Sequence, residues 1–155
     1  MHAPPQQSAF AGFSLIELMI AMVIIAILSV IALPSYSRYI ERSRRSDAWS
    51  ALSTDQGILE RCYAQTFDYR KVLTGSNGCA RLSNTAATPT TSAGAYYGVI
   101  VVSASTSAYM LQATPLAGSP QANDTQCASI SVDSTNTRSA LDSSRADQSV
   151  ACWGH

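Results

Sequence analysis

One acidic residue inside a long apolar run is the clearest chemical signal in the sequence. The run extends from Phe13 to Leu33, and Glu17 is its single charged residue. At a rise of ~1.5 Å per residue, a helix of this length measures roughly 30 Å, the hydrocarbon thickness of a bilayer. A carboxylate in such a span costs about 2.5–3.5 kcal/mol on insertion scales and is normally kept where it has a partner. We therefore predict a membrane-spanning helix whose Glu17 requires a cation that the span itself does not supply.

No group of residues has the pattern of an active site. The two histidines, His2 and His155, lie at the ends of the chain, and the acidic residues are scattered without a close pair that could act as acid and base. A glycine-rich phosphate loop is also missing from the sequence. Ten Lys and Arg balance ten Asp and Glu, so no overall charge attracts the chain to nucleic acid or acidic lipid. We expect no catalytic residue, no metal and no cofactor, and a structural protein rather than an enzyme.

The start of the apolar run resembles the signature of type IV prepilins. Gly12 is followed by Phe-Ser-Leu-Ile-Glu and then by the unbroken apolar segment. In that family a dedicated peptidase cuts after the glycine and the new N-terminal residue is methylated. The resemblance implies cleavage between Gly12 and Phe13 and methylation of Phe13. It also implies that Glu17 pairs with the Phe13 amine of a neighbouring subunit as the helices bundle into a filament. An ordinary signal anchor is the alternative.

Residues 1–12 are interpreted as the prepilin leader peptide. The segment is short and polar, and it lacks the apolar core of a secretory signal peptide. Beyond the span lies an arginine group, which consists of Arg38, Arg42, Arg44 and Arg45. Under the positive-inside rule alone, this group would favour the opposite orientation in the membrane. The peptidase signature decides against that orientation, because the peptidase acts on the cytoplasmic side.

Apolar residues recur at helical spacing after Leu33, which predicts one helix from Phe13 to about Tyr63. Pro34 should kink this helix, since proline lacks a backbone N–H and clashes with the preceding turn. The arginine face is expected to be solvated, with Glu41 and Arg45 at the favourable i, i+4 spacing and Asp47 on the same face.

The second half of the chain has the signals of a small sheet. Residues 64–95 are predicted to be a loop, and strands are predicted at 96–103, 109–114 and 127–133, with a weaker return strand at 137–140. Sequential strands with short connections favour an antiparallel meander whose apolar face packs on the C-terminal half of the long helix. The expected fold class is α+β, of the type IV pilin kind, with a helical stick and a small head.

These predictions give three parts in chain order. Residues 1–12 form the leader. Residues 13–63 form the long helix, with its transmembrane part at 13–33. Residues 64–155 form the head, an α/β-loop and a β-sheet that end in a disulfide-bounded segment.

Four cysteines lie in the exported part, namely Cys62, Cys79, Cys127 and Cys152. None has C-x-x-C spacing and no histidine lies among them, which speaks against a zinc or redox site. An even number of cysteines in an exported chain predicts disulfides. Of the three connectivities we favour Cys62–Cys79 with Cys127–Cys152, because each bond closes a local and otherwise poorly ordered segment.

Motifs along the mature chain resemble the small minor pilins of the PilE type. They are Arg61-Cys62-Tyr63, Cys79, Tyr109-x-Leu-x-Ala-Thr-Pro, Asp124-x-x-Cys127 and Cys152-Trp153. The resemblance implies a minor pilin for type IV pilus assembly that supports twitching motility and surface attachment. Its expected partners are other pilin subunits, the prepilin peptidase and the pilus assembly machinery. It would reside in the inner membrane before assembly and in the extracellular pilus afterwards.

Two other functions remain as alternatives. A major pilin or a secretion-system pseudopilin would have the same structure. A DNA-receptor pilin for uptake would need a basic stripe on the head. Beyond Leu82, two basic residues stand against four acidic ones: Arg138 and Arg145 against Asp124, Asp133, Asp142 and Asp147. Because so acidic a head would make few phosphate contacts, we expect DNA not to be a partner.

Overall fold

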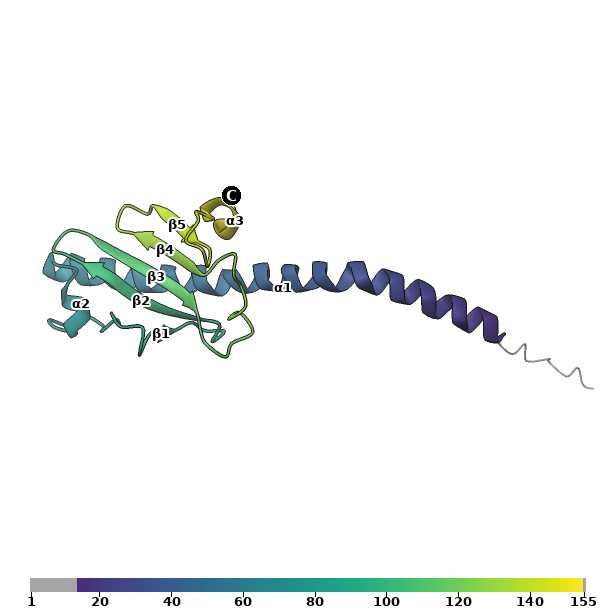
Figure 1. Ribbon diagram of the computed structural model, residues 1–155. Coiled ribbons are helices and arrows are strands. Elements are labelled where there is room, and N and C mark those ends of the chain that lie inside the picture. Colours follow the sequence, from purple (N-terminus) through teal and green to yellow (C-terminus); the bar gives the residue numbers. More distant parts are fainter. Residues whose placement is uncertain (1–13, 155) are drawn as a thin grey trace, which may run out of the picture. The chain divides into compact units, whose positions relative to one another are not determined.

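The computed structural model describes residues 14–154, apart from the side chain of Pro34 (Figure 1). Its helices and strands, in chain order, are α1 (Leu15–Thr66), α2 (Lys71–Thr74), β1 (Thr90–Thr91), β2 (Tyr97–Ala104), β3 (Tyr109–Pro115), β4 (Ser129–Asp133), β5 (Arg138–Leu141) and α3 (Ser149–Trp153). The chain divides into two compact units, Met1–Arg38 and Tyr39–His155, here called unit 1 and unit 2. Helix α1 contributes residues to both.

The described part of unit 1 is the N-terminal segment of α1, whose apolar side chains are exposed. By length and composition α1 can cross a membrane, with a mean hydropathy of 2.9 in its most apolar window. A helix satisfies its own backbone hydrogen bonds, which lipid requires of any spanning segment. The Ser29 and Ser35 hydroxyls likewise donate to the carbonyls of Ile25 and Ile31, one turn earlier. These two hydroxyls are therefore paired within the helix.

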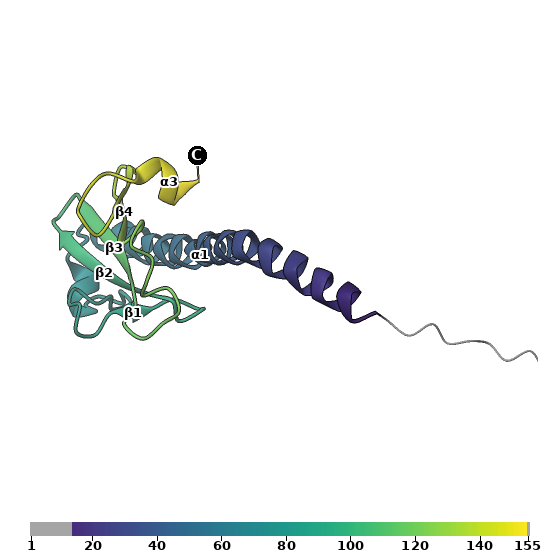
Figure 2. The ribbon, with the colours of Figure 1, turned by 45° about the vertical axis from the view of Figure 1, so that its right-hand side comes forward.

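The five strands of unit 2 form one antiparallel sheet in the order β1-β2-β3-β4-β5. Each strand pairs with the next one in the sequence, so the predicted meander is confirmed. The register sets Val99 opposite Ala113 and Leu111 opposite Val132, which places buried residues of three strands on one face. Figures 1 and 2 show this sheet lying along the part of α1 that belongs to unit 2.

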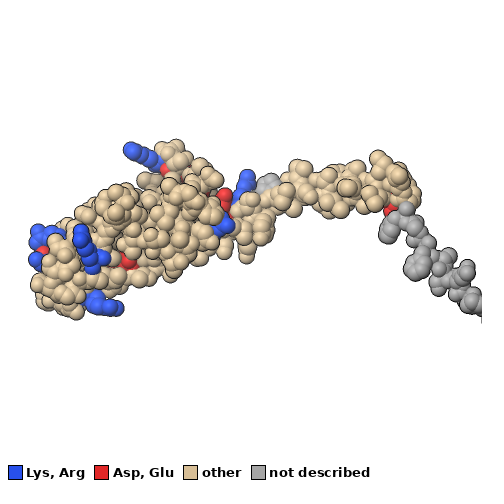
Figure 3. Space-filling view, turned by 90° about the horizontal axis from the view of Figure 1, so that it is seen from below, with Lys and Arg blue, Asp and Glu red and all other residues tan. Residues whose placement is uncertain are grey.

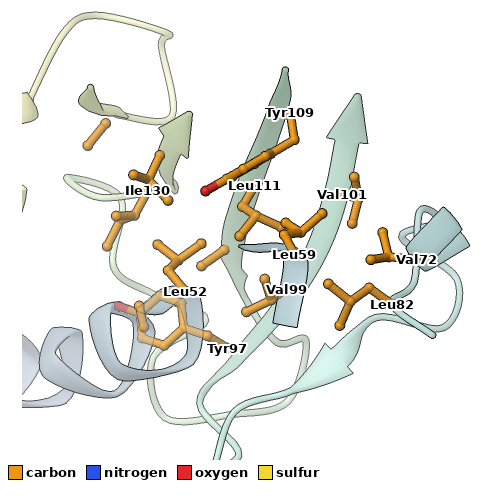
Figure 4. Close-up of a cluster of buried hydrophobic side chains, with 14 of the residues drawn as sticks. Leu52, Leu59, Val72, Leu82, Tyr97, Val99, Val101, Tyr109, Leu111 and Ile130 are labelled. Carbon is orange, nitrogen blue, oxygen red and sulfur yellow. The ribbon is translucent and has the colours of Figure 1, made fainter. Parts of the chain in front are cut away.

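The core of unit 2 lies between α1 and the sheet (Figure 4). Leu52 and Leu59 are seven residues apart, so they lie on one face of α1, and both are almost completely buried. They belong to the same buried cluster as Val99, Leu111 and Ile130 from the strands. The α+β fold predicted from the sequence, with a sheet packed on the long helix, is therefore present.

Several boundaries differ from the predicted ones. Helix α1 ends at Thr66, three residues later than predicted, because its last turn is closed by two bonds. The Thr66 hydroxyl donates to the Cys62 carbonyl at 2.8 Å, and the Phe67 N–H donates to the Tyr63 carbonyl at 2.8 Å. The predicted loop 64–95 also contains α2 and the two-residue strand β1, and α3 was not predicted. The kink at Pro34 stays a prediction.

Candidate assembly residue and basic surface

Glu17 lies in the first turn of α1, where a carboxylate also interacts favourably with the helix dipole. The Glu17 and Leu18 N–H groups donate to the Ser14 carbonyl at 3.1 and 3.2 Å, which closes this turn. Within residues 14–154 the Glu17 side chain has no ion pair or hydrogen bond. Its predicted partner, Phe13, and the predicted cleavage site after Gly12 lie outside the described residues. The pairing and the cleavage site stay predictions.

Arg45 was predicted to lie on a solvated face of the helix, but it is buried. Its side chain is only 3% exposed, and its Nε and Nη2 atoms donate to the two carboxylate oxygens of Asp124, each at 2.8 Å. Gln126 accepts a further bond from Nη2 at 3.1 Å, and Gln121 donates to Asp124 at 2.7 Å. This bidentate pair fastens α1 to the loop between β3 and β4, with both charges withdrawn from water.

The predicted pair between Glu41 and Arg45 is therefore wrong, because Arg45 turns to a carboxylate 79 residues away. Asp47 was also placed on the solvated face, but it binds the segment before β2. Its Oδ1 accepts the Gly94 N–H at 2.9 Å, and its Oδ2 accepts the Ser92 hydroxyl at 2.5 Å. A Cβ at Gly94 would lie 2.8 Å from the Tyr96 ring and 3.0 Å from the Asp47 carboxylate, so glycine permits this close approach.

Asp55 is a buried carboxylate of a different kind. It is 4% exposed and makes no hydrogen bond or ion pair with the described residues. It lines a pocket of about 250 Å³, together with Thr54, Thr90 and Ser92 among other residues. Burial disfavours the charged form and raises the pKa of Asp55 to about 6. Asp55 therefore titrates near neutral pH, unlike an ordinary aspartate.

The four cysteines form the two pairs that the sequence favoured, Cys62–Cys79 and Cys127–Cys152. The first bond joins α1 to the loop that follows α2, with Cα atoms 5.1 Å apart. The second joins the loop before β4 to α3. All four cysteines are buried. Each bond closes a local segment, which limits the conformations available to the unfolded chain.

Basic side chains gather at the end of unit 2 where α1 stops and α2 lies (Figure 3). We call this set the basic end; it consists of Arg61, Arg70, Lys71 and Arg81. All of these side chains are exposed except Lys71, which is half-buried. The Cys62–Cys79 bond holds Arg61 close to the loop that carries Arg81. The Leu82 N–H also donates to the Val72 carbonyl at 2.9 Å, which fixes this loop against α2.

The basic end has two acidic neighbours, and both already have partners. Asp68 accepts a bidentate ion pair from Arg70, and this interaction holds the pKa of Asp68 below its usual value. Glu60 accepts hydrogen bonds from the hydroxyls of Tyr69 and Tyr109 at 3.0–3.2 Å. Burial, followed by the bond to Glu60, raises the pKa of Tyr69 to about 12. Three cations of the basic end, Arg61, Lys71 and Arg81, thus form no ion pair with the described residues, and of these Arg61 and Arg81 are exposed.

The earlier charge count missed the basic end because it started after Leu82. Residues 39–155 hold nine Lys or Arg and nine Asp or Glu, so this part of the chain is neutral rather than acidic. The charges are also unevenly placed, since the basic end lies on one side and the four acidic residues of the earlier count lie elsewhere in the chain. A local basic surface can bind phosphates even when the net charge is zero.

Comparisons with known proteins agree with this architecture. Residues 34–131 match the family model described as "Type IV minor pilin ComP, DNA uptake sequence receptor". Residues 7–33 match the model of the prokaryotic N-terminal methylation motif, which includes Gly12, Phe13 and Glu17.

Curated relatives are fimbrial proteins. The chain is 35% identical over 103 residues to the fimbrial protein EcpC of Eikenella corrodens, which covers 66% of this chain and 61% of EcpC. It is 47% identical over 51 residues to the type IV major fimbrial protein FimA of Dichelobacter nodosus, which covers 33% of each chain. It is 38% identical over 86 residues to a fimbrial protein of Moraxella nonliquefaciens, which covers 48% of this chain and 55% of that protein.

The chain therefore spans less than two thirds of the length of the curated relatives that it matches. Proteins of this family are structural subunits that assemble with other pilins, and they are not enzymes. Because a pilin family model covers residues 34–131, more than half of the sequence, the chain belongs to the type IV pilin family.

Proposed function

We propose that the protein is a minor pilin whose head binds DNA for uptake. The observation that carries this proposal is the basic end, which lies within the residues matched by the family model of a DNA uptake sequence receptor. This revises the earlier expectation that DNA is not a partner, because that expectation rested on a count that omitted residues 61–81. The other expectation, a minor pilin, is kept.

The basic end has the chemistry that phosphate binding needs. Arg61 and Arg81 are exposed guanidinium groups that can each form two parallel hydrogen bonds to a phosphate. Arg70 forms an ion pair with Asp68, so its contribution to phosphate binding should be smaller. Each phosphate contact releases counterions, so the logarithm of the binding constant should fall with the logarithm of salt concentration by about 0.9 per contact.

The test is DNA binding by the full chain in detergent micelles, measured on a duplex at several salt concentrations. The variant Arg61→Gln with Arg81→Gln removes the two exposed cations of the basic end that form no ion pair with the described residues. We expect its affinity at low salt to fall about tenfold or more and the salt slope to decrease by about 2. Arg145→Gln is the matched control, because Arg145 is equally exposed but lies in the loop between β5 and α3.

The proposal fails if the double variant and the Arg145 control bind DNA like the unchanged chain. It also fails if the double variant lowers DNA uptake by cells only in proportion to a loss of pili. A DNA receptor should instead lose uptake while pili and twitching motility are retained. Counting pili in the same cells therefore separates the two explanations.

A second candidate is a minor pilin needed mainly to build pili for twitching motility and attachment. Two features favour it: the match to the N-terminal methylation motif, and Glu17, which has no partner within residues 14–154 and which we expect to act in assembly rather than in DNA binding. In either case the prepilin peptidase would cut between Gly12 and Phe13 on the cytoplasmic side. The protein would lie in the inner membrane before assembly and in the pilus afterwards. A deletion that abolishes pili together with uptake would favour this second candidate.

A further inference from the structure

Phe67 combines two features that are rarely found together. It is the first residue after α1, and its φ of 54° lies in the left-handed region that favours glycine. Its side chain is 74% exposed, so burial does not compensate for the unfavourable backbone. A bulky residue held in such a conformation is an outlier that points to a functional constraint.

Neighbouring bonds hold the Phe67 backbone and ring in place. The Phe67 N–H donates to the Tyr63 carbonyl at 2.8 Å, while the Thr66 hydroxyl accepts the Asp68 N–H at 3.3 Å on the other side. The Phe67 ring meets the Tyr63 ring edge to face, with centroids 6.0 Å apart and planes at 71°. Tyr63 in turn stacks on Tyr69 with centroids 4.4 Å apart.

This array extends into the core, so we expect it to be rigid. Tyr69 contacts the buried Tyr109 edge to face at 4.8 Å, and the Glu60 carboxylate receives both of their hydroxyls. The exposed ring is thus the outer member of a row of four aromatic side chains. A ring fixed in this way loses little conformational entropy when it stacks on a ligand.

The surroundings of Phe67 point to a nucleobase as that ligand. Arg70 and Lys71 follow within four residues, and Arg61 precedes it by less than two helical turns. A nucleotide presents an aromatic face next to an anionic phosphate, so an exposed ring with basic residues close to it in the sequence fits both of its parts. We infer that Phe67 is a stacking platform for an unstacked nucleobase, whereas the basic end holds the adjoining phosphates.

This inference rests on the proposed DNA function and specifies the form of DNA. Bases paired inside a continuous duplex are already stacked on their neighbours, so their faces are not available to Phe67. An available face can come from a single strand or from a frayed duplex end, and the two sources share the same chemistry. Binding that depends on Phe67 should therefore require one of them.

The test uses the full chain in detergent micelles and three fluorescent DNA probes. They are a 20-nucleotide single strand, a blunt-ended duplex, and a closed dumbbell duplex that has no ends. Stacking on one base corresponds to about 5- to 150-fold in affinity. We expect Phe67→Ala to weaken single-strand binding at least fivefold and to leave dumbbell binding within twofold. The blunt duplex should follow the single strand if frayed ends supply the base, and the dumbbell if they do not.

Three further variants control for structure. Phe67→Trp keeps an aromatic face and should retain single-strand binding. Phe67→Gly should raise the unfolding temperature, because glycine accepts a φ of 54°, yet it should lose single-strand binding. A purely structural role for Phe67 would not produce these opposite changes. Val150→Ala removes an apolar side chain that is 72% exposed on α3, and it should bind all probes unchanged.

Two outcomes would overturn the inference and leave the proposed function intact. One is normal single-strand binding by Phe67→Ala, and the other is an equal loss on the dumbbell and the single strand. If the unchanged chain binds none of the three probes, the proposed DNA function fails and this inference fails with it.

Discussion

Glu17 and Arg45 are charged residues on the same helix, and they differ in whether the charge has a partner within the described residues. Arg45, in unit 2, is buried against Asp124 and has its partner inside the chain. Glu17, in unit 1, lies among exposed apolar residues and has no partner within residues 14–154. A charge satisfied internally serves the fold of one subunit. A charge without a partner in an apolar segment is costly, and we propose that Glu17 finds its partner on assembly.

Of the variants considered, Glu17→Gln should have the largest effect, because it removes the charge that has no partner within residues 14–154. The side chain keeps its size and loses its charge, so membrane insertion should become easier and the proposed pairing with the Phe13 amine of a neighbour should be lost. We expect normal cleavage, a stable protein in the membrane fraction, and at least a tenfold loss from sheared pili measured by quantitative immunoblotting. Wild-type levels in sheared pili would rule out charge pairing.

Gly12→Glu tests the other member of the proposed pair, the amine of Phe13. A large charged residue beside the proposed scissile bond should block the peptidase, so that Phe13 would not gain the free amine that we propose as the partner of Glu17. Mass spectrometry should find the leader attached and Phe13 unmethylated. Detection of the mature mass with N-methylated Phe13 would show that the predicted site is wrong.

Breaking the Arg45–Asp124 pair should affect folding rather than assembly. Asp124→Ala leaves the Arg45 charge buried without its partner, and this should lower the free energy of unfolding by about 3–5 kcal/mol. The double variant Arg45→Met with Asp124→Leu removes both charges and should recover most of that loss. Denaturant unfolding of the full chain in micelles measures both variants. Equal destabilisation by the single and the double variant would contradict a charge-based explanation.

Removing a disulfide should have a slightly smaller effect. Replacing Cys127 and Cys152 by Ala opens a loop with a sequence separation of 25 residues, which should cost about 2–4 kcal/mol of unfolding free energy. Nonreducing peptide mapping of the unchanged chain should show both bonds and no free thiol. A crossed pairing in that map would refute the connectivity.

Asp55→Asn should have the smallest effect, and it should be stabilising. The folded-state pKa of Asp55 is about 6 and its ordinary value is 3.8, so the folded state prefers the protonated carboxyl. Its contribution is therefore favourable below pH ~4 and is lost as the pH rises through about 6. Asparagine removes this cost, which should raise the unfolding free energy by at most about 3 kcal/mol at pH 7.5 and hardly at all at pH 4. An equal gain at both pH values would exclude titration as the cause.

The strands show what periodicity can predict. Residues 97–104 and 109–115 alternate between buried and exposed positions or carry β-branched side chains, so their strands were predicted to within one residue at each end. Strand β1 has two residues and is exposed, and a segment that short has no period to detect. Helix α3 has five residues and depends on tertiary contacts such as the stacking of Trp153 on Trp49.

Contacts between residues far apart in the sequence limited how well the site residues could be predicted. Arg45 has Glu41 at helical spacing, and nothing local indicates that Asp124 would replace it. The left-handed backbone of Phe67 could likewise not be predicted, because the residue is neither Gly nor Asn, the types that usually indicate this conformation. The basic end could have been found, because Arg61, Arg70, Lys71 and Arg81 lie within 21 residues; the count missed it by starting too late.

The two disulfides have a mechanical consequence for a subunit of a fibre that is pulled. Each bond removes its loop from the contour length that stretching can release, because covalent bonds do not yield at forces that unfold a domain. The loops have sequence separations of 17 and 25 residues. At about 3.5 Å per extended residue, roughly 60 and 90 Å of chain stay locked. A head that unfolds under tension would therefore lengthen less than its residue count allows. The segment before β1 would stay linked to α1, and α3 would stay linked to the loop before β4.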